Sequence, residues 1–402
     1  MKLHNNLVRA VVDALFLIFT ENKYADKVIE KVLQSNKRWG SHDRGFIAEN
    51  TYEIVRWWRL LNFLARTENE ELTHESLWKI FGVWQIINDE SLPRWEEFAD
   101  IQLNDVEKRY ESAKKTRKLI QSVPDWMDEL ASKELGKQWD REIVALNREA
   151  QVVLRVNTLK TTRSELKALL AEESIETTVL ENMADALVLK ERTNVFTSPH
   201  FKNGLFEIQD ASSQLVADFV EVEGNMRVID ACAGAGGKTL HLAALMQNKG
   251  KIIAMDTEEW KLTELKKRAR RGGANNIETR LIDNNKAIKR LADSADRLLL
   301  DVPCSGLGVL KRNPDAKWKL DVDFINHIKE TQQEILQNYV QMLRKGGQLV
   351  YATCSILPSE SENQVEKFLE SQNGAFELLD QQRISPAQTG FDGFYMARLL
   401  KK

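Results

Sequence analysis

Three cysteines, Cys232, Cys304 and Cys354, are the side chains of this sequence best suited to chemistry, because a thiolate can act as a nucleophile. Cys304 and Cys354 each follow a hydrophobic run that is typical of a strand, in Asp301-Val-Pro-Cys-Ser-Gly306 and Tyr351-Ala-Thr-Cys-Ser355. We therefore expect both thiols at one edge of one sheet, where they would form a working pair.

Other uses of the cysteines are less compatible with the sequence. Their long spacings are unlike a Cys-x-x-Cys clip and no histidine cluster accompanies them, so no metal site is expected. A disulfide between Cys304 and Cys354 is geometrically possible, but nothing indicates an oxidising compartment.

The apolar run at residues 14–19 is too short for a membrane span and lacks a small-residue cleavage site. The sequence predicts a cytoplasmic protein with free thiols and no membrane association.

Composition sets the scale of the protein. With 402 residues, of which 43% are hydrophobic and 29% charged, the chain is long enough for two or three domains with separate cores. The formal net charge of −3 gives no general attraction to nucleic acid, so a polyanionic partner would have to meet local basic patches. No feature of the sequence indicates an oligomer, and we expect a monomer.

Residues 1–122 are predicted to form a helical domain, because apolar residues such as Leu7, Val11 and Leu15 recur at helical spacing. Basic and aromatic residues are interleaved in this region: Lys37, Arg38, Trp39, Arg44, Arg56, Trp57, Trp58, Arg59 and Arg66. Such a mixture suits a phosphate backbone and exposed bases. A tryptophan core beneath a solvated arginine face explains the same pattern about as well.

Two further domains are predicted after the linker at Pro124. Residues 123–209 contain short strands and a helix opened by a capping box of Thr162 and Glu165, which indicates a small α+β domain. Residues 210–402 alternate strand and helix in the manner of a doubly wound α/β sheet, closed by an antiparallel pair of strands near the C-terminus.

A glycine-rich turn follows the first strand of the α/β domain. Backbone N–H groups at the start of the next helix can bind an anionic or polar ligand there. A P-loop requires glycine where Cys232 stands, and a dinucleotide motif requires a third glycine that is missing. The candidate cofactor-binding residues of this turn are Cys232, Ala233, Gly234, Ala235, Gly236, Gly237 and Lys238.

Acidic residues follow three successive strands of the same domain. Asp256 ends the second strand, Asp283 follows the third and Asp301 ends the fourth. An acid after the second strand can accept hydrogen bonds from ribose hydroxyls. Three acids at successive strand ends favour a cofactor that carries a nucleoside, and all three are candidate cofactor-binding residues.

The motifs together resemble those of the RsmB/NSUN family of RNA cytosine-5 methyltransferases, from about Trp126 to the C-terminus. The resemblance is carried by Gln209-Asp-Ala-Ser-Ser213, the glycine-rich turn, Asp301 to Gly308 with Arg312-Asn-Pro-Asp315, and Tyr351 to Ile356 with Glu360 to Asn363. Arg155-Val-Asn-Thr-Leu-Lys160 is similar to the start of the family's small RRM-like subdomain. Residues 44–56 resemble part of the NusB-like RNA-binding domain of bacterial RsmB-type enzymes.

The resemblance implies a Rossmann-like methyltransferase that uses S-adenosyl-L-methionine to form 5-methylcytosine in RNA. The substrate that it favours is 16S rRNA. It assigns Cys354 as the nucleophile that attacks C6 of cytosine and Cys304 as the group that assists product release. It places Asp301 at the N3/N4 edge of the base, and Lys160 as a residue that holds the base or activates the nucleophile. By the same resemblance Cys232 contributes its backbone to the cofactor site.

Two departures and two alternatives accompany this interpretation. Gly234-Ala235 stands where the family more often has Ala-Pro, and Val302 where alanine is commoner, but neither change removes a catalytic group. A transfer RNA methyltransferase of the same chemistry fits everything in the sequence except the NusB-like region. A non-catalytic RNA-binding factor for ribosome assembly fits the domains but leaves the intact cysteines unexplained. In a ribosomal RNA or a transfer RNA methyltransferase alike, the target cytosine must be unpaired or flipped out, because a stacked base hides C6.

Overall fold

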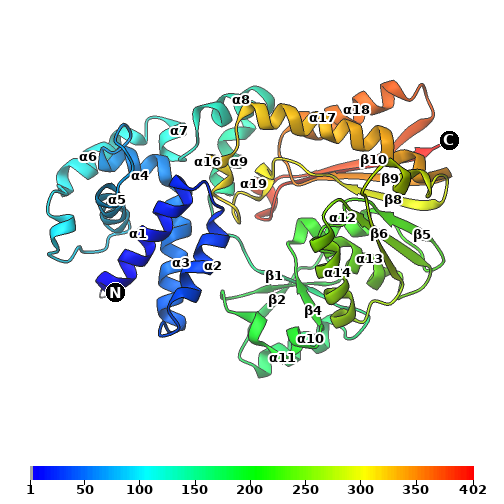
Figure 1. Cartoon of the computed structure of the whole chain (residues 1–402), viewed down its shortest axis with the longest axis horizontal. Helices are drawn as coiled ribbons and strands as arrows, with labels where there is room; N and C mark the ends of the chain where they lie inside the picture. Colours follow the sequence, from blue (N-terminus) through cyan, green and yellow to red (C-terminus); the bar gives the residue numbers. More distant parts are fainter. Residues whose placement is uncertain (1–2) are drawn as a thin grey trace. The chain divides into compact units, whose positions relative to one another are not determined.

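The structure is a computed structural model that describes residues 3–402, and these form two compact units (Figure 1). The first, called the helical unit, contains the chain up to Arg148 together with Leu310–Val322. The second, called the α/β unit, contains Glu149–Val309 and Asp323–Lys402. The segment 310–322 thus belongs to the helical unit although it lies far from it in sequence. The three-domain division expected from the sequence stays a prediction.

The helical unit is built from short helices around one apolar core. Buried side chains such as Val11, Leu15, Ile54 and Phe81 form this core, as the helical spacing of the first residues predicts. Its helices are α1 (Asn5–Thr20), α2 (Ala25–Ser35), α3 (Ser41–Arg56), α4 (Trp58–Ala65), α5 (His74–Ile87), η1 (Glu96–Phe98), α6 (Leu103–Ala113), α7 (Arg117–Ile120), α8 (Asp125–Leu135), α9 (Gln138–Leu146) and α16 (Ala316–Lys319).

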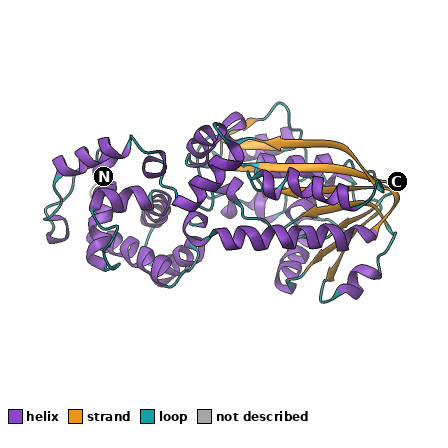
Figure 2. Cartoon of the chain, turned by 90° about the horizontal axis from the view of Figure 1, so that it is seen from above, coloured by secondary structure: helices purple, strands orange, loops and turns teal. Residues whose placement is uncertain are grey.

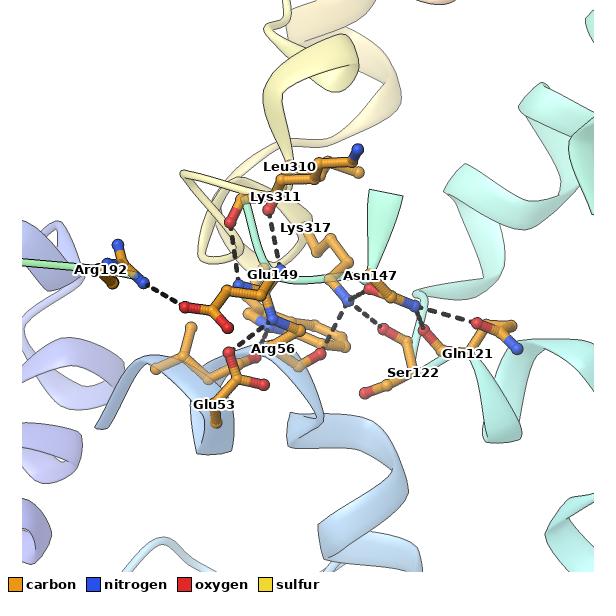
Figure 3. A network of polar contacts seen from close by, with 12 residues as sticks. Glu53, Arg56, Gln121, Ser122, Asn147, Glu149, Arg192, Leu310, Lys311 and Lys317 are labelled. Atoms are coloured by element: carbon orange, nitrogen blue, oxygen red, sulfur yellow. Dashed lines mark hydrogen bonds and ion pairs between the residues drawn. The ribbon is translucent and has the colours of Figure 1, made fainter. Parts of the chain in front are cut away.

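The segment 310–322 is fixed to the helical unit by a buried polar network (Figure 3). The Lys317 side chain is fully buried, and its Nζ donates to the Arg56 carbonyl at 2.7 Å, the Ser122 carbonyl at 3.0 Å and Asn147 Oδ1 at 3.0 Å. The guanidinium of Arg56 donates in return to the carbonyls of Leu310 and Lys311. Burial, and then the nearby Arg56 charge, lowers the pKa of Lys317 well below its usual value.

Several of the basic residues that the sequence places among tryptophans are used inside the helical unit. Arg56 is buried, Arg59 donates to the Val123 carbonyl at 2.7 Å, and Arg66 pairs with Asp105. The three tryptophans of the pattern are partly buried and packed against the core: Trp39, Trp57 and Trp58. These contacts favour the structural interpretation of the pattern for Arg56 and for the tryptophans.

The α/β unit begins with a small antiparallel sheet. Its strand order is β2-β3-β1-β4, and apolar side chains such as Leu154, Leu166 and Phe206 form its core. The elements of this part are β1 (Val153–Val156), α10 (Arg163–Glu172), β2 (Thr177–Val179), β3 (Ala186–Leu189), η2 (Val195–Thr197), α11 (Pro199–Lys202) and β4 (Phe206–Ile208).

A seven-stranded sheet within residues 3–402 forms the rest of the α/β unit, in the order β10-β11-β9-β8-β5-β6-β7. The strands from β9 to β7 are parallel, and β11 runs antiparallel to both β9 and β10. The strands are β5 (Arg227–Asp230), β6 (Lys251–Asp256), β7 (Ile277–Leu281), β8 (Ala295–Asp301), β9 (Leu343–Thr353), β10 (Phe376–Ile384) and β11 (Phe394–Lys401). This sheet confirms the predicted doubly wound core with its closing antiparallel pair.

Helices cover both faces of this sheet (Figure 2), which explains why its strands read as continuous apolar runs. Ile229, Leu298 and Tyr351 point to the face covered by α15, α17 and α18, while their neighbours in sequence point to the face covered by α12 and α13. The helices are α12 (Ala211–Phe219), α13 (Gly237–Leu245), α14 (Glu259–Gly272), α15 (Asn285–Lys289), η3 (Leu307–Val309), α17 (Val322–Tyr339), η4 (Val340–Met342), η5 (Pro358–Glu360), α18 (Glu362–Ser371) and α19 (Pro386–Thr389).

The strand order reverses at β5, whose two neighbours are β6 and β8. Open α/β sheets bind their ligands at such a switch point, outside the carboxyl ends of the strands. Across residues 3–402 no helix is long and apolar enough to cross a membrane, and in the same range no cluster of His, Cys, Asp or Glu could hold a metal ion.

Candidate active site

The candidate site lies at the carboxyl ends of four adjacent strands. In the sheet order β9-β8-β5-β6, these strands end at Thr353, Asp301, Asp230 and Asp256. The strands are parallel, so the residues that follow them lie along one edge of the sheet. Cys354 directly follows β9, and Cys304 follows β8 by three residues. The expectation that both cysteines share an edge is thus confirmed.

The two thiols are in contact. Cys304 Sγ and Cys354 Sγ lie 3.3 Å apart, and both side chains are partly exposed free thiols. The hydrogen bond with Cys354 raises the pKa of Cys304 well above its ordinary value, and burial and the Glu360 charge add to this effect. The environment therefore keeps Cys304 in its protonated form.

Close backbone packing holds the two cysteine loops together. The N–H of Gly308 donates to the Cys354 carbonyl at 2.9 Å, and the N–H of Gly393 donates to the Gly308 carbonyl at 2.8 Å. A Cβ atom at Gly308 would lie 2.2 Å from the Gly393 carbonyl oxygen and 2.7 Å from that of Cys354. Glycine at position 308 is therefore required for the observed approach of the loops.

The glycine-rich turn joins β5 to α13 and contacts the end of β6. Gly234 has a φ of 54° and Gly236 a φ of 88°, both in the left-handed region that favours glycine. The N–H of Gly234 donates to Asp256 Oδ2 at 2.8 Å. A Cβ added at Gly234 would meet no described atom within 4 Å, so the turn leaves open space there. A glycine turn at the start of a helix, with an adjacent carboxylate and open space, fits a polar nucleoside ligand.

An ion pair connects the glycine-rich turn to the β8 edge. Lys238 Nζ lies 2.6 Å from Asp301 Oδ2, and it also lies 5.2 Å from the centre of the Phe394 ring. Thr239, the residue after Lys238, donates to the buried carboxyl of Asp230 at 2.7 Å. Burial raises the pKa of Asp230 to about 7. Lys238, predicted as a cofactor-loop residue, thus also binds the acid predicted to hold the base.

The third cysteine lies in a different environment from the pair. Burial, and after it the negative charges of Asp230, Asp301 and Asp256, raises the pKa of Cys232 well above its usual value. A thiol in such surroundings stays neutral and is a poor nucleophile. These surroundings support the interpretation that Cys232 contributes its backbone.

Two predicted site residues are not brought to the cysteines. Lys160 Nζ donates to the backbone carbonyls of Asn203 at 2.8 Å and Arg271 at 2.6 Å, which fixes its side chain between α11 and α14. Asp283 is exposed and lies two residues beyond the end of β7, the strand next to β6. The structure gives neither residue a contact with the cysteine pair, and their predicted roles stay predictions.

Other residues of the site were not assigned a role from the sequence. Four buried residues connect the two cysteine loops through hydrogen bonds: Glu360, Gln332, Ser305 and Ser355. The signal that could have indicated them is the repeated Cys-Ser dipeptide, followed in the second motif by a glutamate five residues after the serine.

The fold and the site together define a Rossmann-like methyltransferase. Residues 217–400 match the family described as 16S rRNA methyltransferase RsmB/F, and residues 123–196 match the ferredoxin-like domain of RsmF/B-like methyltransferases. A solved structure, that of PH0851, aligns over 100% of both chains with a TM-score of 0.84 at 24% sequence identity, which shows a shared fold.

Two relatives of known family show which family the chain belongs to. The chain is 31% identical to the probable ribosomal RNA small subunit methyltransferase B of Synechocystis sp., over 94% of this chain and 96% of that protein. It is 34% identical to the ribosomal RNA small subunit methyltransferase B of Vibrio cholerae, over 69% of this chain and 65% of that protein. The chain therefore belongs to the RsmB/F methyltransferase family, as the resemblance of its motifs implies.

Proposed function

We propose that this protein uses S-adenosylmethionine to methylate C5 of a cytosine in 16S rRNA, through a covalent adduct between Cys354 and C6 of the base. The contact between the Cys304 and Cys354 sulfurs, 3.3 Å apart at the switch-point edge, is the observation that carries this proposal. The names of the relatives support ribosomal RNA of the small subunit as the substrate.

The covalent step makes an unreactive carbon nucleophilic. C5 of cytosine is too weak a nucleophile to accept a methyl group directly, so the thiolate of Cys354 adds to C6 and gives C5 the character of an enamine. Bound S-adenosylmethionine would supply the methyl group. Loss of the C5 proton and expulsion of the Cys354 thiolate then restore the aromatic ring. The C5 proton passes to solvent, and Cys304, in contact with Cys354 and held as a thiol, is positioned to give its proton to the departing Cys354 sulfur.

The acids and the glycine-rich turn bind two different ligands, the cytosine base and the cofactor. Asp301 Oδ1 is free of the Lys238 contact made by Oδ2, and we assign Asp301 to the N3/N4 edge of the cytosine. We assign the open turn from Cys232 to Lys238 and the adjacent Asp256 to the cofactor, with Asp283 further along the same edge. Every role falls within one chain, so we propose a monomer, and a ribosomal substrate implies a cytoplasmic location.

The substrate is tested by bisulfite sequencing of total RNA from a strain that lacks this protein. We expect one cytosine of 16S rRNA to lose its methyl group, and to regain it when the wild-type chain is restored but not when Cys354→Ala is restored. Loss of methylation at a transfer RNA cytosine, with 16S rRNA unchanged, would show the transfer RNA enzyme instead. Unchanged methylation at every cytosine would contradict catalytic function.

A further inference from the structure

Glu360 is a fully buried glutamate at the end of η5, directly before α18. Its carboxylate accepts four hydrogen bonds. Oε2 accepts from the Ser305 N–H at 2.8 Å and from Gln332 Nε2 at 3.2 Å. Oε1 accepts from the hydroxyls of Ser305 at 2.5 Å and Ser355 at 2.6 Å. None of these four donors is a cation, so hydrogen bonds alone offset the cost of burying this group.

The two serines that contact Glu360 have equivalent places in the two motifs. Ser305 directly follows Cys304, and Ser355 directly follows Cys354. Each serine hydroxyl also accepts a hydrogen bond from the backbone N–H two residues further on, from Leu307 at 3.3 Å and from Leu357 at 3.1 Å. The two loops thus have the same local turn, and one carboxylate oxygen bonds both of them.

Further contacts extend this connection to the neighbouring elements. Gln332 of α17 donates to the Pro303 carbonyl at 3.0 Å as well as to Glu360, and Tyr351 of β9 donates to the Glu360 carbonyl at 2.8 Å. The residues on both sides of Cys304 are therefore tied to Glu360, directly or through Gln332. A shift of the carboxylate would move both cysteine loops.

We propose that Glu360 is a positioning residue, which holds Cys304 and Cys354 in contact through Ser305 and Ser355. The role of this contact in methyl transfer rests on the function proposed above. The contact itself does not, because it is a property of the folded protein that chemistry outside the reaction can measure. The charge of Glu360 has a second effect, since it helps to keep Cys304 in the thiol form.

Disulfide formation measures the contact directly. Diamide oxidises two adjacent thiols to a disulfide: the S–S bond forms, and the two electrons and two protons reduce the diazene to a hydrazine. Two sulfurs held 3.3 Å apart should react quickly, and mass spectrometry of peptides identifies the Cys304–Cys354 link. In Glu360→Ala, where the loops separate, we expect the rate of this cross-link to fall about tenfold or more, since small displacements have large effects on reactions between fixed groups.

Glu360→Gln separates geometry from charge. Its carbonyl oxygen can accept from the Ser305 N–H and Gln332, while its amide can donate to the two hydroxyls, which are able to accept. We expect the cross-linking rate of this variant to stay within about twofold of wild type, with the rate of methyl transfer less impaired than in Glu360→Ala. The lost charge should lower the pKa of Cys304, and so shift the alkaline limb of the pH–rate profile to lower pH.

Three further variants complete the experiment. Glu366→Gln alters an exposed glutamate of the adjacent α18 and should leave both the cross-linking and the methylation rates unchanged. Ser305→Ala combined with Glu360→Ala should slow cross-linking no more than Glu360→Ala alone, because both changes break one connection. Ser305→Ala alone, which removes one hydroxyl donor to Glu360, should also slow cross-linking, and this measurement remains informative even if Glu360→Ala folds poorly.

The outcomes separate this inference from the proposed function. Cross-linking of Glu360→Ala at the wild-type rate, in a folded protein, would overturn the positioning role whatever the enzyme methylates. Slow cross-linking in Glu360→Ala with wild-type methylation would support the positioning of the thiols but overturn the role of their contact in methyl transfer. Slow cross-linking together with no RNA methylation by the wild-type protein would leave the positioning of the thiols supported and refute the proposed function.

Discussion

At the residue scale, the surroundings of each cysteine give it a different character. Cys232 is kept neutral by burial and three nearby acids, and Cys304 by Cys354, burial and Glu360. Residue type and spacing alone predict that Cys304 and Cys354 meet, because both follow parallel strands. They do not reveal that Cys304 stays protonated, because that depends first on the hydrogen bond with Cys354 and on burial, and the charge of Glu360, which the fold brings close, adds to these effects.

Asp301 provides a test of base recognition. Asp301→Asn removes the negative charge that pairs with Lys238 and that would face the protonated base edge. We expect kcat to fall by about 10² to 10⁴, the range of general acid–base groups, with little change in the affinity for S-adenosylmethionine. Single-turnover methylation and isothermal titration with the cofactor measure the two effects. Asp323→Asn, an exposed change on α17, serves as control, and wild-type kcat in Asp301→Asn would refute the assignment.

At the element scale, the cysteine loops need a glycine where three backbone segments meet. In Gly308→Ala the new methyl group would meet the carbonyl oxygens of Gly393 and Cys354 at 2.2 Å and 2.7 Å. We expect methyl transfer to fall about 100-fold, because the Cys304 loop must move away from Cys354. Gly45→Ala, in α3, is the matched control for a glycine-to-alanine change, because its new Cβ would meet only the Glu49 side chain, at an ordinary contact distance of 4.0 Å. Activity of Gly308→Ala equal to that of the control would contradict the packing argument.

A buried histidine on α13 predicts acid sensitivity of the α/β unit. Burial lowers the pKa of His241 to about 4, and the groups that face it are Asp185, Asp218 and Arg155. In the unfolded chain this histidine binds a proton near pH 6.5. The contribution of neutral His241 to the free energy of unfolding is therefore fully present above that pH and is lost as the pH falls toward 4. Urea unfolding at pH 7.5 and pH 5 should show this loss, with a limit of about 3 kcal/mol at lower pH. Between these two pH values, the free energy of unfolding of His241→Gln should fall less than that of the wild type. An identical fall in the two proteins would exclude His241 as its source.

At the scale of the whole molecule, the chain passes between its two compact units at residues 148–149, 309–310 and 322–323. The sequence predicts the helical first part, the small antiparallel sheet and the doubly wound sheet, because each has a local periodicity. It does not predict that residues 310–322 belong to the helical unit. Lys317 meets Arg56, which is 261 positions away, and a contact at that separation leaves no periodic pattern.

Local breaks were also missed for a physical reason. The sequence indicates one polar helix over 105–121, whereas α6 ends at Ala113 and α7 begins at Arg117. Arg117 binds Asp128 and Asp140, and tertiary contacts of this kind override helix propensity. The resemblance of motifs implies a site role for Lys160; its side chain donates to the carbonyls of Asn203 and Arg271, and the role stays a prediction.

Lys317 tests how firmly the segment 310–322 is held. Lys317→Ala leaves the carbonyls of Arg56 and Ser122 and the amide of Asn147 without their donor. We expect the free energy of unfolding to fall by about 2 to 4 kcal/mol, with faster hydrogen exchange in 310–322. Lys319→Ala, which loses an exposed hydrogen bond to Asn22 and a contact with the exposed Tyr24 ring, should change stability by less than about 0.5 kcal/mol. Equal effects of the two changes would contradict a structural role for the buried lysine.

The covalent adduct is the central claim, and trapping it is the most direct test. Purified Cys304→Ala and Cys354→Ala are incubated with the small-subunit RNA and S-adenosylmethionine, then denatured and separated by gel. Cys304→Ala should form an RNA–protein adduct that survives denaturation, because attack at C6 proceeds while release is blocked. Cys354→Ala and the double variant should form none. An adduct that accumulates in Cys354→Ala and is absent from Cys304→Ala would reverse the two roles, and no adduct in either variant would contradict the mechanism.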